Sequence, residues 1–188
     1  MRVLIADDEA LTRMGLRAML QDMGHVLVGA AADGGEALRL ACSARPELAI
    51  LDIKMPVMDG LSVAEEISRQ CPLPVIMLTA HSERELIERA VATETVQAYL
   101  VKPVREAGLG PVIELAVSRY SEWRILRQEA ADRQSALAAR EVVDQAKQIL
   151  ISRQDLTERQ AFLEIQHRAR RERRTMRQVA ETILSSSS

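Results

Sequence analysis

Short apolar runs alternate with helical patterns over the first 120 residues of the chain. Five runs rich in Val, Ile, Leu and Ala predict strands, and the apolar positions between them have helical spacing. The runs lie at residues 3–6, 26–30, 48–51, 75–78 and 98–101. Near-continuous apolar runs of this length are typical of parallel strands that are covered on both faces. The pattern therefore predicts an α/β fold with a doubly wound, five-stranded parallel sheet.

Turn and capping residues mark the ends of the helices predicted between these strands. The markers are Gly24, Asp33, Pro46, Gly60, Pro72 and Pro74. The sequence Ser82-x-x-Glu85 matches a capping box and predicts the start of a fourth helix.

The strand pattern stops after Gly108, and helical patterns follow. From Pro111 to about Ile151 the chain has no further Pro or Gly, which predicts one long helix or two nearly continuous helices. A broken heptad pattern comprises Ile113, Ala116, Tyr120, Trp123, Ala130 and Leu137. This seam could pair with a second chain or pack on the chain's own first domain, and the pattern leaves both open.

Three apolar stripes near the C-terminus predict a small three-helix bundle. They comprise Val142, Val143, Ala146, Ile149 and Leu150, then Ala161, Phe162 and Ile165, then Met176, Val179, Ala180, Ile183 and Leu184. The capping boxes Thr157-x-x-Gln160 and Thr175-x-x-Gln178 begin the second and third helices. The predicted domains are a sheet domain at 1–120, a helical linker at 121–139, the bundle at 140–184 and a disordered tail at 185–188.

Charge is unevenly divided along a chain whose net charge is only -2. Residues 1–120 carry 12 Lys and Arg against 17 Asp and Glu, whereas residues 121–188 carry 13 against 10. The C-terminal part is therefore the better contact for an acidic partner. Aromatic residues make up 2% of the chain, so the core must be aliphatic.

The cysteines and the lack of long apolar runs indicate in which cellular compartment the protein is expected. Cys42 and Cys71 lack the spacing of a metal or redox motif, and we expect buried free thiols. No run approaches the roughly 18–20 apolar residues of a membrane helix. Met1-Arg2 leads straight into the first predicted strand, without a signal peptide. We therefore expect a cytoplasmic protein that does not contact membranes.

Polar side chains follow four of the predicted strands. They are Asp7 and Asp8, Asp52, Thr79 and Lys102. In doubly wound sheets, ligands bind beyond the carboxyl ends of the strands. Carboxylates there suit a divalent cation, while an amine and a hydroxyl suit a phosphoryl group. The sequence thus predicts a site for a cation and a phosphoryl group.

Residues 1–120 resemble the receiver domain of two-component response regulators. The resemblance rests on Asp7-Asp8, Asp52-x-x-Met55-Pro56-x-Met58-Asp59-Gly60, Thr79-Ala80 and Lys102-Pro103. It implies a flavodoxin-like fold with strand order 2-1-3-4-5 and a sensor histidine kinase as partner. Thr95 departs from the family, which usually has Gly before the fifth strand, so we expect a different local backbone there.

The resemblance also implies a role for each site residue. Asp52 would accept the phosphoryl group, and Mg²⁺ would bind Asp7, Asp8, Asp52 and the backbone carbonyl of Lys54. Thr79 and Lys102 would contact the phosphoryl oxygens, and the Lys102–Pro103 peptide would be cis. Tyr99 stands at the aromatic switch position, and with Thr79 it would relay phosphorylation.

Residues 140–184 resemble the ANTAR family of RNA-binding antitermination domains. The matching stretches are Ala146-Lys147-x-Ile149-Leu150, Leu156-Thr157-x-x-Gln160-Ala161-Phe162, Arg173-Arg174-Thr175-Met176 and Val179-Ala180. Gln148 and Asp155 stand where the family tends to have Gly, which leaves the RNA preference open.

A basic stretch supports an RNA contact in this region. Between His167 and Arg177 there are six Arg against one Glu. The predicted RNA-binding residues are Lys147, Arg153, Arg168, Arg170, Arg171, Arg173, Arg174 and Arg177. No aromatic lies in the stretch, so we do not expect base stacking of the kind used by sheet-type RNA readers, and we expect Arg and Lys on helices to contact the backbone and loop bases of a hairpin.

Together these features predict a phosphorylation-controlled regulator that binds RNA hairpins in leader transcripts and prevents transcription termination. It would not be an enzyme, beyond assisting its own phosphotransfer and dephosphorylation. A homodimer through the long helix is an added hypothesis. The alternative is a regulator whose helical tail binds a protein and not RNA. A DNA-binding output is not expected, because the tail lacks a convincing helix-turn-helix.

Overall fold

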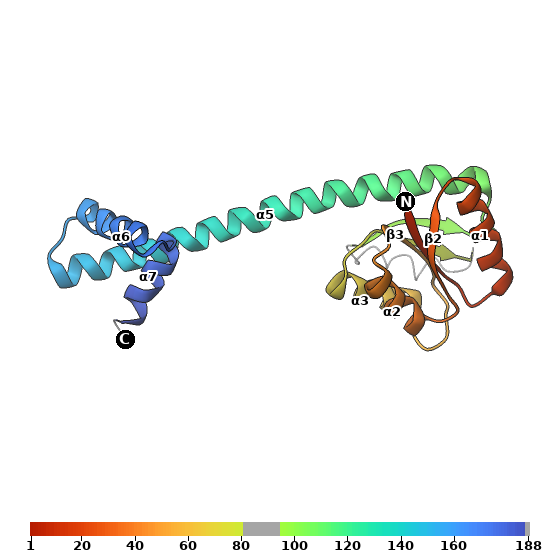
Figure 1. The fold of residues 1–188 in the computed structure, drawn as a ribbon, viewed down its shortest axis with the longest axis horizontal. Coiled ribbons are helices and arrows are strands. Elements are labelled where there is room, and N and C mark those ends of the chain that lie inside the picture. Colours follow the sequence, from red (N-terminus) through yellow and green to blue (C-terminus); the bar gives the residue numbers. More distant parts are fainter. Residues whose placement is uncertain (81–94, 187–188) are drawn as a thin grey trace. The chain divides into compact units, whose positions relative to one another are not determined.

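The computed structural model describes residues 1–80 and 95–186, which contain a parallel sheet and six helices (Figure 1). The strands are β1 (Arg2–Ala6), β2 (Val26–Ala31), β3 (Leu48–Asp52), β4 (Val75–Thr79) and β5 (Val96–Val101). The helices are α1 (Ala10–Asp22), α2 (Gly34–Ala44), α3 (Gly60–Gln70), α5 (Glu106–Gln154), α6 (Glu158–Glu172) and α7 (Met176–Ser185). The predicted Ser82–Glu85 capping box lies outside the described residues.

The sheet has the strand order β2-β1-β3-β4-β5 and is parallel throughout, which confirms the predicted fold. Helices α2 and α3 cover one face, where Ala37, Ala41 and Ile67 are fully buried. Helix α1 and the first turns of α5 cover the other face. Because β3 and β4 are buried along their whole length, their carboxyl ends are held rigidly in the middle of the sheet.

Helix α5 is one continuous helix that begins at Glu106, earlier than the sequence pattern indicates. Pro111 lies inside it, although Pro removes a helical hydrogen bond. The burial of Leu109, Ile113 and Ala116 against the sheet outweighs that local cost. The chain divides into two compact units, Met1–Arg124 and Ile125–Ser188, and α5 contributes to both.

The second unit is built from the end of α5 together with α6 and α7. Its core comprises Ala146, Leu150, Ala161, Ile165, Ala169, Val179, Ala180 and Ile183. Both predicted capping boxes are present. The backbone N–H of Gln160 donates to Thr157 Oγ1 at 3.3 Å, and that of Gln178 donates to Thr175 Oγ1 at 3.2 Å. These caps fix the starts of α6 and α7. None of the helices described is long and apolar enough to cross a membrane.

Cys42 and Cys71 form a disulfide, so the prediction of two free thiols was wrong. Cys42 lies in α2 and Cys71 is the C-cap of α3, and their Cα atoms are 5.4 Å apart. The cysteines are 29 residues apart in sequence, and it is the packing of α2 beside α3 on one sheet face that brings them together.

The structure shows how the chain accommodates other residues at the three positions where the two families usually have Gly. Thr95 is absent from the described residues that have a positive φ, as expected for a Thr in this place. Its buried hydroxyl instead donates to the carbonyl of Ala64 in α3, at 3.2 Å. Asp155 has φ 53°, a left-handed conformation that Asp tolerates better than most residues. Gln148 lies inside α5, where its helix propensity is favourable.

Candidate functional site

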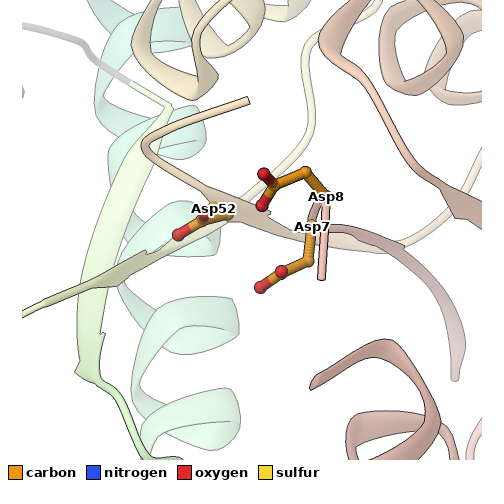
Figure 2. Close-up of side chains that lie close together, drawn as sticks. All are labelled: Asp7, Asp8 and Asp52. Carbon is orange, nitrogen blue, oxygen red and sulfur yellow. The ribbon is translucent and has the colours of Figure 1, made fainter. Parts of the chain in front are cut away.

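Two adjacent strands bring the acidic residues together. Strands β1 and β3 pair with Ala6 opposite Leu51, so Asp7 and Asp52 follow at neighbouring strand ends. One carboxylate oxygen from each of Asp7, Asp8 and Asp52 lies within 4.8 Å of the other two (Figure 2). The structure thus places the three predicted acidic ligands in one cluster.

The environments of the three carboxylates differ. Asp7 is fully buried, and its Oδ1 accepts a hydrogen bond from the Glu9 backbone N–H at 2.9 Å. Asp52 is nearly buried, whereas Asp8 is exposed. Two carboxylates are therefore fixed by the fold and one remains in contact with solvent.

Lys102 provides the positive charge of the site. Its Nζ lies 2.8 Å from Asp7 Oδ2 and 3.0 Å from Asp52 Oδ1. The Lys102–Pro103 peptide is cis, as expected, and the Lys102 N–H donates to the Thr79 carbonyl at 2.9 Å. Burial alone would lower the pKa of Lys102, but the hydrogen bonds to Asp7 and Asp52 outweigh it and raise the pKa. The amine therefore stays charged.

The charge balance at Asp52 favours a bound cation. Burial raises the pKa of the Asp52 carboxyl, the nearby charges of Asp7 and Asp8 raise it further, and Lys102 opposes them. Three carboxylates against one ammonium leave an excess of negative charge in a largely buried place. A divalent cation with a preference for oxygen ligands fits this donor set. The carbonyl of Lys54 as a further ligand stays a prediction.

Thr79 and Tyr99 lie on neighbouring strands beside the acidic cluster. Thr79 ends β4, is buried, and donates from Oγ1 to the Ala80 carbonyl at 3.0 Å. Tyr99 pairs with Met77 across β4 and β5, and its ring packs against the core under α2 and α3. Within residues 1–80 and 95–186, the Tyr99 hydroxyl is buried without a hydrogen-bond partner, and burial raises its pKa.

Two glycines let the chain after Asp52 pack tightly around the site. A Cβ at Gly60 would lie 2.0 Å from the backbone oxygen of Asp52. A Cβ at Gly34 would lie 2.0 Å from the backbone oxygen of Met58. No side chain fits at either place, so both positions require glycine.

Six of the eight predicted basic residues lie at the end of α6, at the start of α7 or between the two helices. Arg171 is highly exposed, while Arg168 pairs with Glu164 and Arg177 pairs with Glu181 on their own helices. Arg174 donates to Thr182 Oγ1 at 3.0 Å. Arg173 is the C-cap of α6, and Arg170 is exposed. The Arg177–Glu181 pair is exposed and the Arg168–Glu164 pair is partly exposed, so both pairs are weak and the arginines remain able to turn toward a polyanion.

Lys147 and Arg153 differ from this group. The Nζ of Lys147 lies 2.7 Å from Asp144 and 2.9 Å from Glu158, and its side chain is 13% exposed. Lys147 therefore links α5 to the first turn of α6, and its charge is already balanced by two carboxylates. Arg153 lies exposed in the last turn of α5.

Phe162 is a candidate that the sequence analysis assigned to the core. Ala161 and Ile165 are buried, but Phe162 is 41% exposed. It lines a pocket of about 510 Å³ with Ala139, Arg140, Val143, Asp144, Lys147, Thr175, Met176 and Arg177. The signal that could have found it is its position, one residue off the i, i+4, i+8 stripe that Ala161 begins.

Comparison with known proteins agrees with both parts of the chain. Residues 3–114 match the family model of the response regulator receiver domain, and residues 131–184 match that of the ANTAR domain. The transcriptional regulatory protein PdtaR of Mycobacterium tuberculosis is 46% identical over 183 residues, which is 97% of this chain and 89% of that protein.

Two solved receiver domains have a similar fold. The signal receiver domain of a modulated diguanylate cyclase from Desulfovibrio desulfuricans G20 has a TM-score of 0.59 and 33% identity, covering 64% of this chain and 95% of that one. The receiver domain of the sensor histidine kinase PA1611 from Pseudomonas aeruginosa PAO1 has a magnesium ion coordinated in its active site cleft. Its TM-score is 0.56 at 28% identity, covering 62% of this chain and 97% of that one.

Proposed function

Because the chain belongs to the response regulators that join a receiver domain to an ANTAR domain, we propose that it is a phosphorylation-controlled RNA-binding antiterminator. The observation that carries this proposal is the grouping of Asp7, Asp52 and Lys102 in one unit of a chain whose other unit carries a basic helical surface. The receiver domain occupies residues 1–120. A helical linker follows at residues 121–139, and the ANTAR domain occupies residues 140–184. The protein acts in the cytoplasm, where its transcripts are made.

Asp52 is the phosphoacceptor, and a sensor histidine kinase is the donor. A carboxylate oxygen of Asp52 attacks the phosphorus of a kinase phosphohistidine, so an O–P bond forms as the N–P bond breaks. The imidazole nitrogen keeps the electron pair. Lys102, already 3.0 Å from Asp52 Oδ1, is placed to offset the charge of the transferred group. The chain thereby assists its own phosphorylation and the later hydrolysis.

Mg²⁺ is the cofactor that this donor set suits. Asp7, Asp8, Asp52 and the Lys54 carbonyl would hold it, and the bound ion would neutralise charge on the phosphoryl oxygens. Asp8 is the exposed member of the set, so it gives the ion a route from solvent.

Thr79 and Tyr99 form the switch. The Thr79 hydroxyl leaves the Ala80 carbonyl and donates to a phosphoryl oxygen, and the Tyr99 ring, whose hydroxyl is buried in this structure, shifts with it. Tyr99 lies on β5, three residues before Lys102, whose peptide bond to Pro103 is cis. Its movement changes the surface around β5.

The output is binding to hairpins in a leader transcript, which prevents a terminator from forming. Arg168, Arg170, Arg171, Arg173, Arg174 and Arg177 contact phosphates, with Arg153 at the end of α5. Lys147 supports the fold of the domain and contributes less to the RNA contact. A homodimer through α5 would engage two hairpins and raise avidity.

A gel-shift titration with a two-hairpin leader RNA tests the proposal. Salt-sensitive binding should increase when Mg²⁺ and a small phosphodonor are both present. Asp52→Ala should abolish the phosphodonor effect, whereas Asp22→Ala, which removes an exposed aspartate at the end of α1, should leave it intact.

Two outcomes would count against this function. Persistence of the phosphodonor effect in Asp52→Ala would show that another residue is the acceptor. Absence of salt-sensitive RNA binding in either state would favour the alternative, in which the helical unit binds a protein.

A further inference from the structure

The pocket that Phe162 lines is contained in the second compact unit. All its lining residues fall between Ala139 and Arg177, from α5, α6 and the start of α7. Its volume of about 510 Å³ is within the range of small-molecule sites, about 300–1,000 Å³. Phe162 is the only Phe of the chain, and the fold leaves this residue 41% exposed. The pocket therefore offers an aromatic face to an occupant.

The apolar wall is bordered by cations. Val143 and Met176 extend the apolar surface beside the Phe162 ring. Of the four charged lining residues, Asp144 and Lys147 balance each other at 2.7 Å. Arg140 is exposed on the rim, and Arg177 is held only by an exposed pair with Glu181 at 2.8 Å, so both cations can turn toward a polyanion.

An aromatic wall with a basic rim fits some classes of ligand better than others. An apolar protein segment would cover the ring but would take the Arg140 charge and the exposed Arg177–Glu181 pair out of water without offering them a new partner. A flat, unpaired nucleobase with phosphates on both sides satisfies the ring and the rim together. The pocket wall also continues into the basic surface, because Thr175 directly follows Arg173 and Arg174.

Resting on the proposed RNA-binding function, we propose that this pocket receives one unpaired base of the RNA, stacked on Phe162, with the adjacent phosphates on Arg140 and Arg177. RNA recognition by this chain then includes stacking of one base on Phe162, in addition to the contacts expected from the basic stretch. The base comes from a hairpin loop, because a paired base has no free face.

The test uses the full chain with Mg²⁺ and a small phosphodonor. Hairpins that bind are selected from a pool with a constant stem and a randomised loop, and each loop base of a selected hairpin is then replaced by an abasic residue. At one loop position the abasic change should weaken binding to the unchanged chain by about tenfold or more. The same change should alter binding to Phe162→Ala by less than about twofold.

Three further variants make the result specific. Phe162→Trp should retain binding, because it keeps an aromatic ring for stacking. This variant also keeps the test decisive if Phe162→Ala unfolds. Leu163→Ala is the matched control, because Leu163 has the same 41% exposure on α6 but does not line the pocket. Arg177→Ala should reduce the slope of log affinity against log salt by about one, whereas Phe162→Ala should leave the slope unchanged.

The possible failures are distinguishable. If a selected hairpin binds Phe162→Ala as tightly as the unchanged chain, or if abasic losses are the same in both, the base pocket is refuted while the RNA-binding function stands. If the unchanged chain selects no hairpin at all, the proposed function fails and the base pocket fails with it.

Discussion

The Asp52 carboxylate has a position that disfavours its ionised form. It is 6% exposed, close to two other carboxylates, and stabilised in its charged form by the Lys102 ammonium. Burial is the largest cause of its raised pKa. A nucleophile must be ionised, so the residue depends on nearby positive charge for its reactivity.

This raised pKa predicts how stability depends on pH. In metal-free buffer the folded chain keeps a proton on Asp52 at pH values where the unfolded chain has lost it. Stability from this group is therefore present below the unfolded pKa, about 3.9, and is lost as pH rises through the folded pKa. Urea midpoints measured against pH should show the unchanged chain losing stability relative to Asp52→Asn as pH rises. A constant difference between the two across this window would contradict the assignment.

Val57 has a strained backbone in the loop after Asp52. Its φ is 68° and its side chain is exposed, so nothing in its packing requires a β-branched residue. Val57→Gly should raise the free energy of unfolding by about 0.5–1 kcal/mol, because the left-handed penalty of about 1–2 kcal/mol exceeds the entropic cost of Gly. Urea denaturation measures this.

The control is Val26→Gly, at an exposed position in β2 whose φ is not positive. It should lower the free energy of unfolding by about 0.5–1 kcal/mol. Destabilisation of both variants to the same degree would show that Val57 is not strained.

The ligand cluster could be predicted from sequence because each acid directly follows a strand. Asp7 and Asp52 needed only the parallel pairing of their strands to meet. Phe162 was assigned to the core because a one-residue difference in helix phase decides between core and surface, and its apolar side chain obscured that difference. The engagement of Lys147 by Glu158 likewise depends on how α6 packs on α5.

At the scale of elements, α2 and α3 are joined twice, by packing and by the Cys42–Cys71 disulfide. The bond closes a loop with a sequence separation of 29 residues. Closing a loop of this length restricts the unfolded chain and stabilises the fold by about 3–4 kcal/mol in the entropic account.

Reduction should therefore destabilise the receiver domain. We expect dithiothreitol to lower the urea midpoint of the unchanged chain, by up to the equivalent of about 3–4 kcal/mol. The double variant Cys42→Ser, Cys71→Ser should be less stable and insensitive to dithiothreitol. Free thiols in the air-oxidised protein, detected by mass after alkylation, would show that the bond does not form.

The strands and capped helices were predictable because their signals are local. The apolar runs, Asp33, Thr157 and Thr175 act on their own few residues, and the structure confirms them. The start of α5 was misplaced because the local signals of Gly108 and Pro111 are overruled by burial against the sheet. The disulfide was missed for a related reason, since only tertiary packing brings its two ends together.

At the scale of the molecule, helix α5 contributes to a hydrophobic core in each of the two compact units. Between them, every residue from Arg124 to Leu137 is exposed, including Ile125 and Leu126. A helical stretch without tertiary packing is marginal in water. The proposed homodimer would give this stretch a partner along the heptad seam that ends at Leu137.

Substitution on and off the seam tests the dimer. Leu137→Glu should lower the dimer population of the phosphodonor-treated chain in analytical ultracentrifugation, because it places a charge in the seam. Leu126→Glu is the matched control and should leave the dimer population unchanged. Leu126 is 65% exposed, against 63% for Leu137, and lies off the heptad positions. Equal sedimentation of Leu137→Glu and the unchanged chain would argue against pairing through α5.

The two tightly packed glycines, Gly34 and Gly60, limit which amino-acid substitutions the chain around Asp52 can accept during evolution. Any single substitution at Gly34 or Gly60 drives a side chain into the backbone oxygen of Met58 or Asp52. Gly15 on α1, by contrast, has open space where a side chain would go. Random mutation can therefore replace Gly15 in a single step, while Gly34 and Gly60 can change only together with the backbone that packs on them.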